Sequence, residues 1–85
     1  MTPRFHASLF PWPGGSWIFV AVPEDLAPPV TDGFGRTPVV ATVNGKTWET
    51  SVWRDKGTRT LLAVPRRIRG DLGPGDVVEV TLAPR

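Results

Sequence analysis

The chain has one histidine, and its position two residues before a serine is the first place to look for chemistry. In "FHASLF" the side chains of His6 and Ser8 would share one face of a β-strand, opposite Phe5 and Leu9. An imidazole beside a hydroxyl can activate a nucleophile, but such a site also needs a third group that orients the imidazole. A simple hydrogen bond between two neighbouring side chains is far commoner. We therefore expect no catalytic residue and no enzyme.

Metal and cofactor sites have still less support from the residue types. The chain has no cysteine and a single histidine, and its carboxylates are scattered without the spacing of metal ligands. The segment "GFGRTP" is not a phosphate-binding loop, because it lacks the Lys-Ser/Thr pair and the strand-to-helix context. We expect neither a bound metal nor a cofactor.

Basic residues concentrate in one short part of the chain. Sixteen residues, 54–69, hold six basic side chains and one acidic side chain, a net charge of +5. The candidate contacts to nucleic acid or another anion are Arg54, Lys56, Arg59, Arg66, Arg67 and Arg69. Clustered cations are what a phosphate backbone requires, although a solvated charged surface has the same composition. The total net charge is only +2, which is low for a DNA-binding protein, so nucleic-acid binding is the alternative hypothesis.

Four tryptophans are many for 85 residues. Trp12 stands between two prolines and Trp53 ends a hairpin strand, so we expect both to be partly exposed, whereas we expect Trp17 and Trp48 in the core. Exposed aromatic rings beside turns often mark contact surfaces, but rings that only cover the ends of a barrel give the same pattern. Our first hypothesis is a non-catalytic binding module whose partner is a protein or a small molecule.

The elements that position these side chains read mostly as strands. "TPVVATVNGKTWETSVW" contains two alternating runs joined by Asn44-Gly45, the preferred pair for a two-residue type I′ hairpin, because both central residues need a positive φ. This turn places Val43 opposite Lys46 and Ala41 opposite Trp48. The side chains predicted to share the core face are Val39, Ala41, Val43, Trp48, Thr50 and Val52.

Other segments complete a β-rich pattern with one short helix. In "DVVEVTL" the apolar residues Val78, Val80 and Leu82 alternate with outward residues, and "WIFVAV" and "LLAV" are apolar on both faces, as in central strands. One helix of one or two turns is expected near residues 66–72, ending at Gly73, with Gly70 as a weakness. The segment "PEDLAPPV" should be irregular because two prolines interrupt it.

The two halves of the chain are similar to each other. "FHASLF", "FVAVP" and "TPVVATV" match "WETSVW", "LLAVP" and "DVVEVTL" in the same order, so we expect two strand-turn-strand-connection-strand repeats, at about 4–43 and about 46–83. One repeat could not cover its own strand edges, whereas two could close a core. The expected fold is an all-β, small double-split β-barrel. It would be a single domain, 1–85, that folds alone as a monomer.

Charge and hydropathy set further limits. Residues 1–43 carry a net charge of −1 and residues 44–85 a net charge of +3, so all the positive excess lies in the second half. The longest apolar run, "WIFVAV", is far shorter than the roughly 20 residues that span a bilayer. The first ten residues lack the apolar stretch of a signal peptide. We therefore expect a cytoplasmic protein without a membrane partner.

These segments together support a resemblance to a known family. Through "FHASL", "WIFVAVP", "GRTPVVATVNG", "WETSV" and "LLAVPRRIRGDLGPGDVVEVTL", the chain resembles a bacterial family of domains of unknown function, DUF1905, over roughly residues 4–83. That family is similar in fold to the double-split barrels of AbrB-type and MazE-type DNA-binding regulators, which build one barrel from two short chains. The resemblance implies the same barrel made from the two halves of this chain. It implies no activity.

Overall fold

The computed structural model describes residues 4–27, 35–55 and 59–85, and most of them lie in strands. The strands are β1 (Arg4–Ser8), β2 (Phe10–Pro11), β3 (Ile18–Val22), β4 (Arg36–Val43), β5 (Lys46–Asp55), β6 (Arg59–Ala63) and β7 (Val77–Pro84). Two short helices connect them, the 3₁₀ turn η1 (Glu24–Leu26) after β3 and α1 (Arg66–Arg69) after β6.

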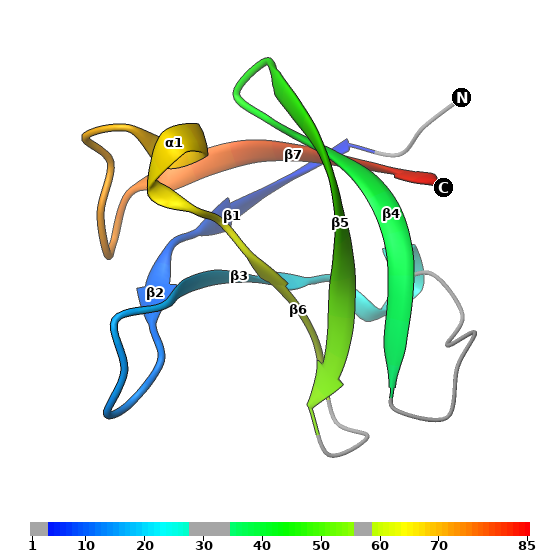
Figure 1. Cartoon of the computed structure of the whole chain (residues 1–85), viewed down its shortest axis with the longest axis horizontal. Helices are drawn as coiled ribbons and strands as arrows, with labels where there is room; N and C mark the ends of the chain where they lie inside the picture. Colours follow the sequence, from blue (N-terminus) through cyan, green and yellow to red (C-terminus); the bar gives the residue numbers. More distant parts are fainter. Residues whose placement is uncertain (1–3, 28–34, 56–58) are drawn as a thin grey trace.

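The strands form one antiparallel sheet in the order β1-β7-β4-β5-β6-β3-β2, which curls into a nearly closed barrel (Figure 1). Leu9 brings the two ends of this sheet together, because it alone separates β1, which pairs with β7, from β2, which pairs with β3. Its N–H donates to the Asp76 carbonyl and its carbonyl accepts from the Gly75 N–H, both at 2.8 Å. One stretch of chain thus changes neighbour from β7 to β3, and the all-β small barrel is confirmed.

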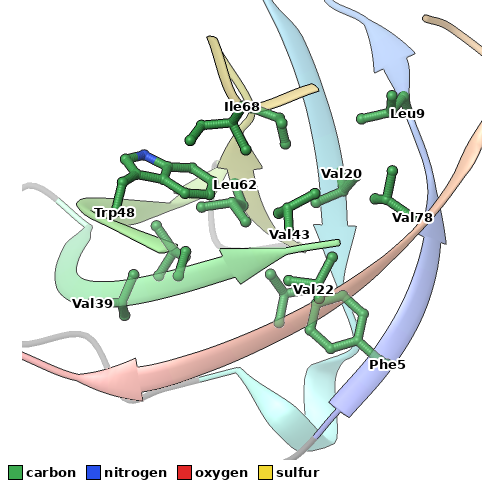
Figure 2. Packing of buried hydrophobic residues seen from close by; sticks show 14 residues of the cluster. Phe5, Leu9, Val20, Val22, Val39, Val43, Trp48, Leu62, Ile68 and Val78 are labelled. Carbon is green, nitrogen blue, oxygen red and sulfur yellow. The ribbon is translucent and has the colours of Figure 1, made fainter. Parts of the chain in front are cut away.

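The core is built largely from valine, a β-branched residue that is favoured in strands. Alternate residues along the strands point into the barrel. Figure 2 shows these side chains meeting inside the barrel, including Phe5, Leu9, Val20, Val22, Val39, Val43, Trp48, Leu62, Ile68 and Val78. The predicted inward residues of the last strand, Val78, Val80 and Leu82, do pack in or against this core. The expectation that Trp48 is a core residue is also confirmed, since the side chain is buried.

The β4–β5 hairpin has the predicted register. Val43 lies opposite Lys46 and Ala41 opposite Trp48, and the two turn residues, Asn44 and Gly45, have φ angles of 48° and 87°. These left-handed angles are those of a type I′ turn, which only Asn and Gly adopt at low cost. Of the residues predicted on its inner face, all but the half-buried Thr50 are buried.

The helix after β6 is shorter than the sequence indicated. It ends at Arg69, because Gly70 takes a φ of 60° that stops the helical path three residues before the predicted stop at Gly73. Ile68 still packs into the core and Leu72 packs against it. The counterpart "PEDLAPPV" starts with the single turn η1, and its residues 28–30 lie outside the described part. Among the described residues, no helix has the length and hydropathy to cross a membrane.

The strand pairing is compatible with the predicted repeat. Suppose that β1, β3 and β4 of the first repeat correspond to β5, β6 and β7 of the second. The β1–β7 ladder then corresponds to the β5–β4 ladder, and exchange of the two repeats leaves the β3–β6 and β4–β7 ladders unchanged. This exchange symmetry is what two equivalent halves would produce. The duplication itself stays a prediction.

Candidate functional site

Four aromatic side chains gather on the outer face of the β2–β3 hairpin. Phe10 lies opposite Phe19 in the ladder, and the Trp12 N–H donates to the Trp17 carbonyl at 3.0 Å, which continues the pairing beyond β2. On each strand the two aromatic residues are two positions apart, so all four side chains share the face opposite buried Val20. We call Phe10, Trp12, Trp17 and Phe19 the aromatic cluster.

Phe19 is the centre of the aromatic cluster. Its ring centroid lies 6.3 Å from that of Phe10, 5.6 Å from that of Trp12 and 6.5 Å from that of Trp17. The Trp12 ring meets it edge-on at 66°, whereas the Trp17 ring is nearly parallel at 28°. These separations and angles are those of favourable aromatic pairs. The rings therefore hold one another in a defined arrangement on the surface.

The prediction that Trp17 is a core residue is wrong. Its side chain is 63% exposed, and that of Trp12 is 36% exposed. The physical reason is the alternation of β3, which directs Val20 and Val22 into the barrel and therefore directs Phe19, and Trp17 before it, outward. The apolar second face of "WIFVAV" is thus an aromatic surface.

A sequence signal for this cluster existed and was missed. In "FPWPGGSWIF" two aromatic pairs, each with spacing i, i+2, flank residues 13–16. A hairpin closing on those four residues puts all four rings on one face. The expectation that Trp17 lies in the core left Phe10, Trp17 and Phe19 out of the candidate contact residues.

Trp53 forms a second exposed aromatic site, on β5. It is 44% exposed and faces outward, because its neighbour Val52 is in the core. Arg36 lies opposite it in the ladder, and the guanidinium carbon is 5.1 Å from the centre of the indole, a cation–π contact. The predicted partial exposure of Trp12 and Trp53 is confirmed, and both rings lie on the outer face of the sheet.

Leu61 lies between the two aromatic regions. It is paired with Trp53 on one side and with Ala21 on the other, and it faces outward because Leu62 faces the core. It is nevertheless only 3% exposed. The outer face of β3, β6 and β5 therefore contains a buried apolar residue between Ala21 and Trp53.

Arg59 connects the aromatic cluster with a pocket beside it. Its guanidinium carbon is 5.2 Å from the centre of the Phe10 ring, which is a second cation–π contact. The same arginine lines a pocket of about 210 Å³. The other residues that line this pocket are Val22, Glu24, Arg54 and Thr60. Among the described residues, two arginines and one glutamate therefore line this volume.

The six basic residues predicted as anion contacts do not form one group. Arg54 and Arg59 belong to the β5–β6 end, whereas Arg66, Arg67 and Arg69 lie on or beside α1, past the other end of β6 (Figure 1). A strand of five residues separates the groups by roughly 15 Å. Arg69 donates to the Val64 carbonyl at 3.1 Å. Lys56 lies outside the described residues. Of the basic residues in the described part of the chain, Arg59 is in contact with a ring of the aromatic cluster, that of Phe10.

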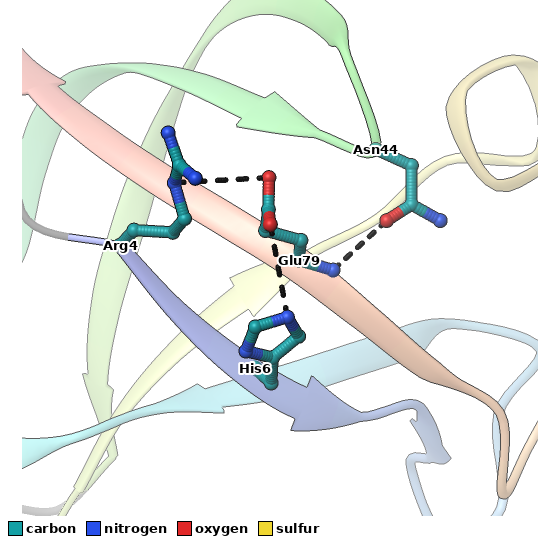
Figure 3. A network of polar contacts seen from close by, with 4 residues as sticks. All are labelled: Arg4, His6, Asn44 and Glu79. Atoms are coloured by element: carbon teal, nitrogen blue, oxygen red, sulfur yellow. Dashed lines mark hydrogen bonds and ion pairs between the residues drawn. The ribbon is translucent and has the colours of Figure 1, made fainter.

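A polar network occupies the outer face of β1 and β7 (Figure 3). Glu79 lies opposite His6 in the ladder, with 3.7 Å between a carboxylate oxygen and Nε2 of His6, and its other oxygen is 3.8 Å from Nε of Arg4. The His6 contact is an ion pair only when the imidazole is protonated. Asn44 accepts a hydrogen bond from the Glu79 N–H at 2.8 Å through its side-chain oxygen. The predicted outward position of His6 and Ser8 is confirmed.

Comparison with known proteins identifies the family and nothing more specific. No curated protein matches the chain. The family model described as a domain of unknown function, DUF1905, matches residues 5–82. This range includes every strand residue of the barrel core and the whole aromatic cluster. The chain therefore belongs to the DUF1905 family.

Proposed function

We propose that this protein is a non-catalytic binding module and that the aromatic cluster is its contact surface. The observation that carries the proposal is the 63% exposure of Trp17 within a group of four rings, three of which contact the central Phe19. Exposed apolar surface costs about 25 cal/mol per Å² relative to its burial, and large exposed apolar groups mark interaction sites. Tryptophan is also among the residues that contribute most to binding when a partner covers it.

The order of the cluster supports the same function. Phe19 contacts the other three rings, so their orientations are set before any partner arrives. Such preorganisation lowers the entropy that binding must overcome, because fewer side-chain rotamers are lost. The small-molecule or protein partner expected from the sequence would gain affinity from this rigid apolar surface.

Nucleic-acid binding is the second candidate, and one observation favours it in a restricted form. A continuous track of six basic residues would suit a duplex, but the two groups of arginines lie at different ends of β6. Arg59, in contrast, lies against Phe10 and so combines positive charge with the aromatic cluster. The support is therefore for contacts at the β5–β6 end.

Nuclear magnetic resonance tests the contact surface without knowledge of the partner. The ¹⁵N-labelled chain is titrated with proline-rich and acidic peptides, mononucleotides, sugars and short oligonucleotides. We expect shifts at the indole N–H of Trp12 and Trp17 and at the amides of β2 and β3, while the indole of buried Trp48 serves as the internal control. Shifts concentrated on β1 and β7, or no shifts with any ligand, would contradict the proposal.

A matched pair of variants separates a contact role from general surface hydrophobicity. Trp17→Ala and Val77→Ala each remove an exposed apolar residue, 63% and 59% exposed respectively, one just before β3 and one at the start of β7. Trp17→Ala should lose the ligand-induced shifts, and Val77→Ala should retain them. Equal loss in both variants would assign the binding to non-specific apolar contact.

A further inference from the structure

We propose that the aromatic cluster, together with Arg59 and Arg54, binds single-stranded nucleic acid, with bases stacking on the exposed rings and phosphate groups held by the guanidinium groups. This inference rests on the proposed contact surface and assigns its ligand. It differs from the basic patch expected from the sequence, since it uses rings of the first half of the chain and two arginines of the second.

Trp17 provides the stacking surface. Its ring is nearly parallel to that of Phe19, at 28°, and it is the most exposed ring of the cluster. A base placed on the outer side of Trp17 would extend this parallel arrangement by one ring. Stacking of a base on an aromatic side chain is tolerant of sequence, because every base has two flat π faces. The cluster thus has the shape that an unpaired base needs.

Arg59 provides the phosphate contact beside the rings. The guanidinium carbon of Arg59 lies 5.2 Å from the centre of the Phe10 ring, and the group carries five N–H donors in one plane. This planar fork matches two phosphate oxygens. The contact with Phe10 therefore holds a phosphate-binding group at the border of the aromatic cluster.

The spacing of the cluster suits several nucleotides. From Arg59 to Phe10, Phe19 and Trp17 the successive separations are 5.2, 6.3 and 6.5 Å. Each step exceeds the roughly 3.4 Å that a nucleotide adds along one stacked strand. A mononucleotide could reach only part of this surface. A short strand could contact Arg59 and Trp17 together.

The pocket beside Arg59 adds a second phosphate contact and one opposing charge. Arg54 and Arg59 both line the volume of about 210 Å³, and Glu24 lines it as well. The carboxylate repels phosphate, so it should weaken binding and set a requirement for low salt. Neutralising Glu24 should therefore strengthen the binding of a strand and should not affect an uncharged ligand.

A duplex and a peptide fit these observations less well. Base faces are inaccessible in a duplex, so stacking on the rings would contribute nothing. A proline-rich peptide could pack on the rings but would not use Arg54 and Arg59. The combination of stacked rings and guanidinium groups favours a single strand.

Fluorescence anisotropy with the full chain provides the test. Labelled twelve-nucleotide oligo(dT) and oligo(U) are compared with a labelled duplex of equal length across a salt series, and a proline-rich peptide is added as a competitor. We expect both single strands to bind more tightly than the duplex. The logarithm of the binding constant should fall against the logarithm of salt with a slope of roughly −1.4, for two phosphate contacts on a single strand.

Four variants assign the binding to the proposed residues. Trp17→Ala should weaken strand binding about tenfold, within the range for loss of one stacked base. Arg59→Gln should weaken it and reduce the magnitude of the salt slope by about 0.7. Arg4→Gln, the matched loss of an exposed arginine on the outer face of β1, should change neither quantity, and Glu24→Gln should strengthen binding. The unchanged indole signal of buried Trp48 shows that each variant is folded.

The outcomes separate this proposal from the one on which it rests. Equal affinity for duplex and single strand, no binding at low salt, or equal effects of Arg59→Gln and Arg4→Gln would overturn single-stranded nucleic acid as the ligand. If peptides or other small molecules still shift the indoles of Trp12 and Trp17, the contact surface stands and only its ligand changes. If no ligand shifts them, both proposals fail.

Discussion

The outer face of β1 and β7 carries Arg4, His6 and Glu79, whereas the outer face of the β2–β3 hairpin carries the aromatic cluster. Both surfaces arise from the same alternation of residues along strands that enclose one core. On the first, charged side chains contact one another at 3.7–3.8 Å and remain well solvated. On the second, rings contact one another and Trp17 stays in water. The outer face of a strand can therefore carry either a solvated polar network or a group of contacting aromatic rings.

The two surfaces differ in which of their contacts stabilise the fold. Exposed ion pairs contribute little to stability, and the important contact on the polar side is the one between Asn44 and the Glu79 backbone. On the aromatic side, Phe19 contributes by contacting three rings, while Trp17 contacts one and is mostly exposed. We infer that stability and binding are separable within the aromatic cluster, and the following predictions test this comparison.

The largest effect is expected for Phe19→Ala. This change removes the central ring of the aromatic cluster and so ends its contacts with Phe10, Trp12 and Trp17. Because Phe19 is half-buried, the free energy of unfolding should fall by about 2 kcal/mol, less than the loss for a fully buried phenylalanine. Urea denaturation measures it. A loss below about 0.5 kcal/mol would mean that the cluster does not stabilise the barrel.

Asn44→Ala should have the next largest effect. Alanine cannot accept the hydrogen bond from the Glu79 N–H, and it is strained at a φ of 48°. The free energy of unfolding should fall by about 1–2 kcal/mol. Asn44→Gly separates the two causes, since glycine tolerates the angle but lacks the acceptor. If both variants are as stable as the parent chain, the Asn44 side chain does not stabilise the turn, and the backbone hydrogen bond from the N–H of residue 44 to the Glu79 carbonyl is sufficient.

Trp17→Ala should reduce stability by about 0.5 kcal/mol, because one ring pair is lost and little surface is uncovered. The same variant should lose the ligand-induced shifts. Binding would then depend mainly on Trp17, and stability mainly on Phe19. Urea denaturation and the titration described above are run on the same sample. A stability loss as large as that of Phe19→Ala would show that Trp17 is a structural residue.

Glu79→Gln should give the smallest effect. It removes the ion pair with Arg4 and the charge that faces His6, whose atoms are 3.8 and 3.7 Å from the carboxylate in an exposed setting. The free energy of unfolding should change by at most about 0.5 kcal/mol, and the change should shrink in high salt. Parallel denaturation curves at low and high salt measure this. A larger loss would mean that the polar network, not only the Asn44 contact, holds β1 against β7.

Local sequence rules predicted a substantial part of this fold. The Asn44-Gly45 turn, the register around it and the burial of Trp48 follow from neighbouring residues, because a two-residue hairpin fixes its own pairing. The position of the short helix was also predicted from neighbouring residues. Its end was not, because either Gly70 or Gly73 could have taken the backbone angle that stops a helix, and Gly70 does. The alternation of the last strand was also readable from composition alone.

Trp17 and the basic residues show where such rules stop. Alternation says that Trp17 and Phe19 share a face, but which face is outside depends on β6, which is about forty residues away in the sequence. The separation of Arg59 from Arg67 depends on the direction of β6 and on where α1 follows it, although the charges are close in sequence. The composition of a segment gives the number of its charges, but a binding site also requires that these charges lie close together in space.

By itself, the sequence determined the strands, their turns, the family and the residue types available for contact, because these depend on short-range sterics and on hydrophobic alternation. Only the tertiary structure decided that Leu9 passes the chain from β7 to β3, that four rings meet on the outside, and that Arg59 lies against one of them. Those outcomes depend on pairing between distant strands, whose registers are set by closure of the whole barrel around its core.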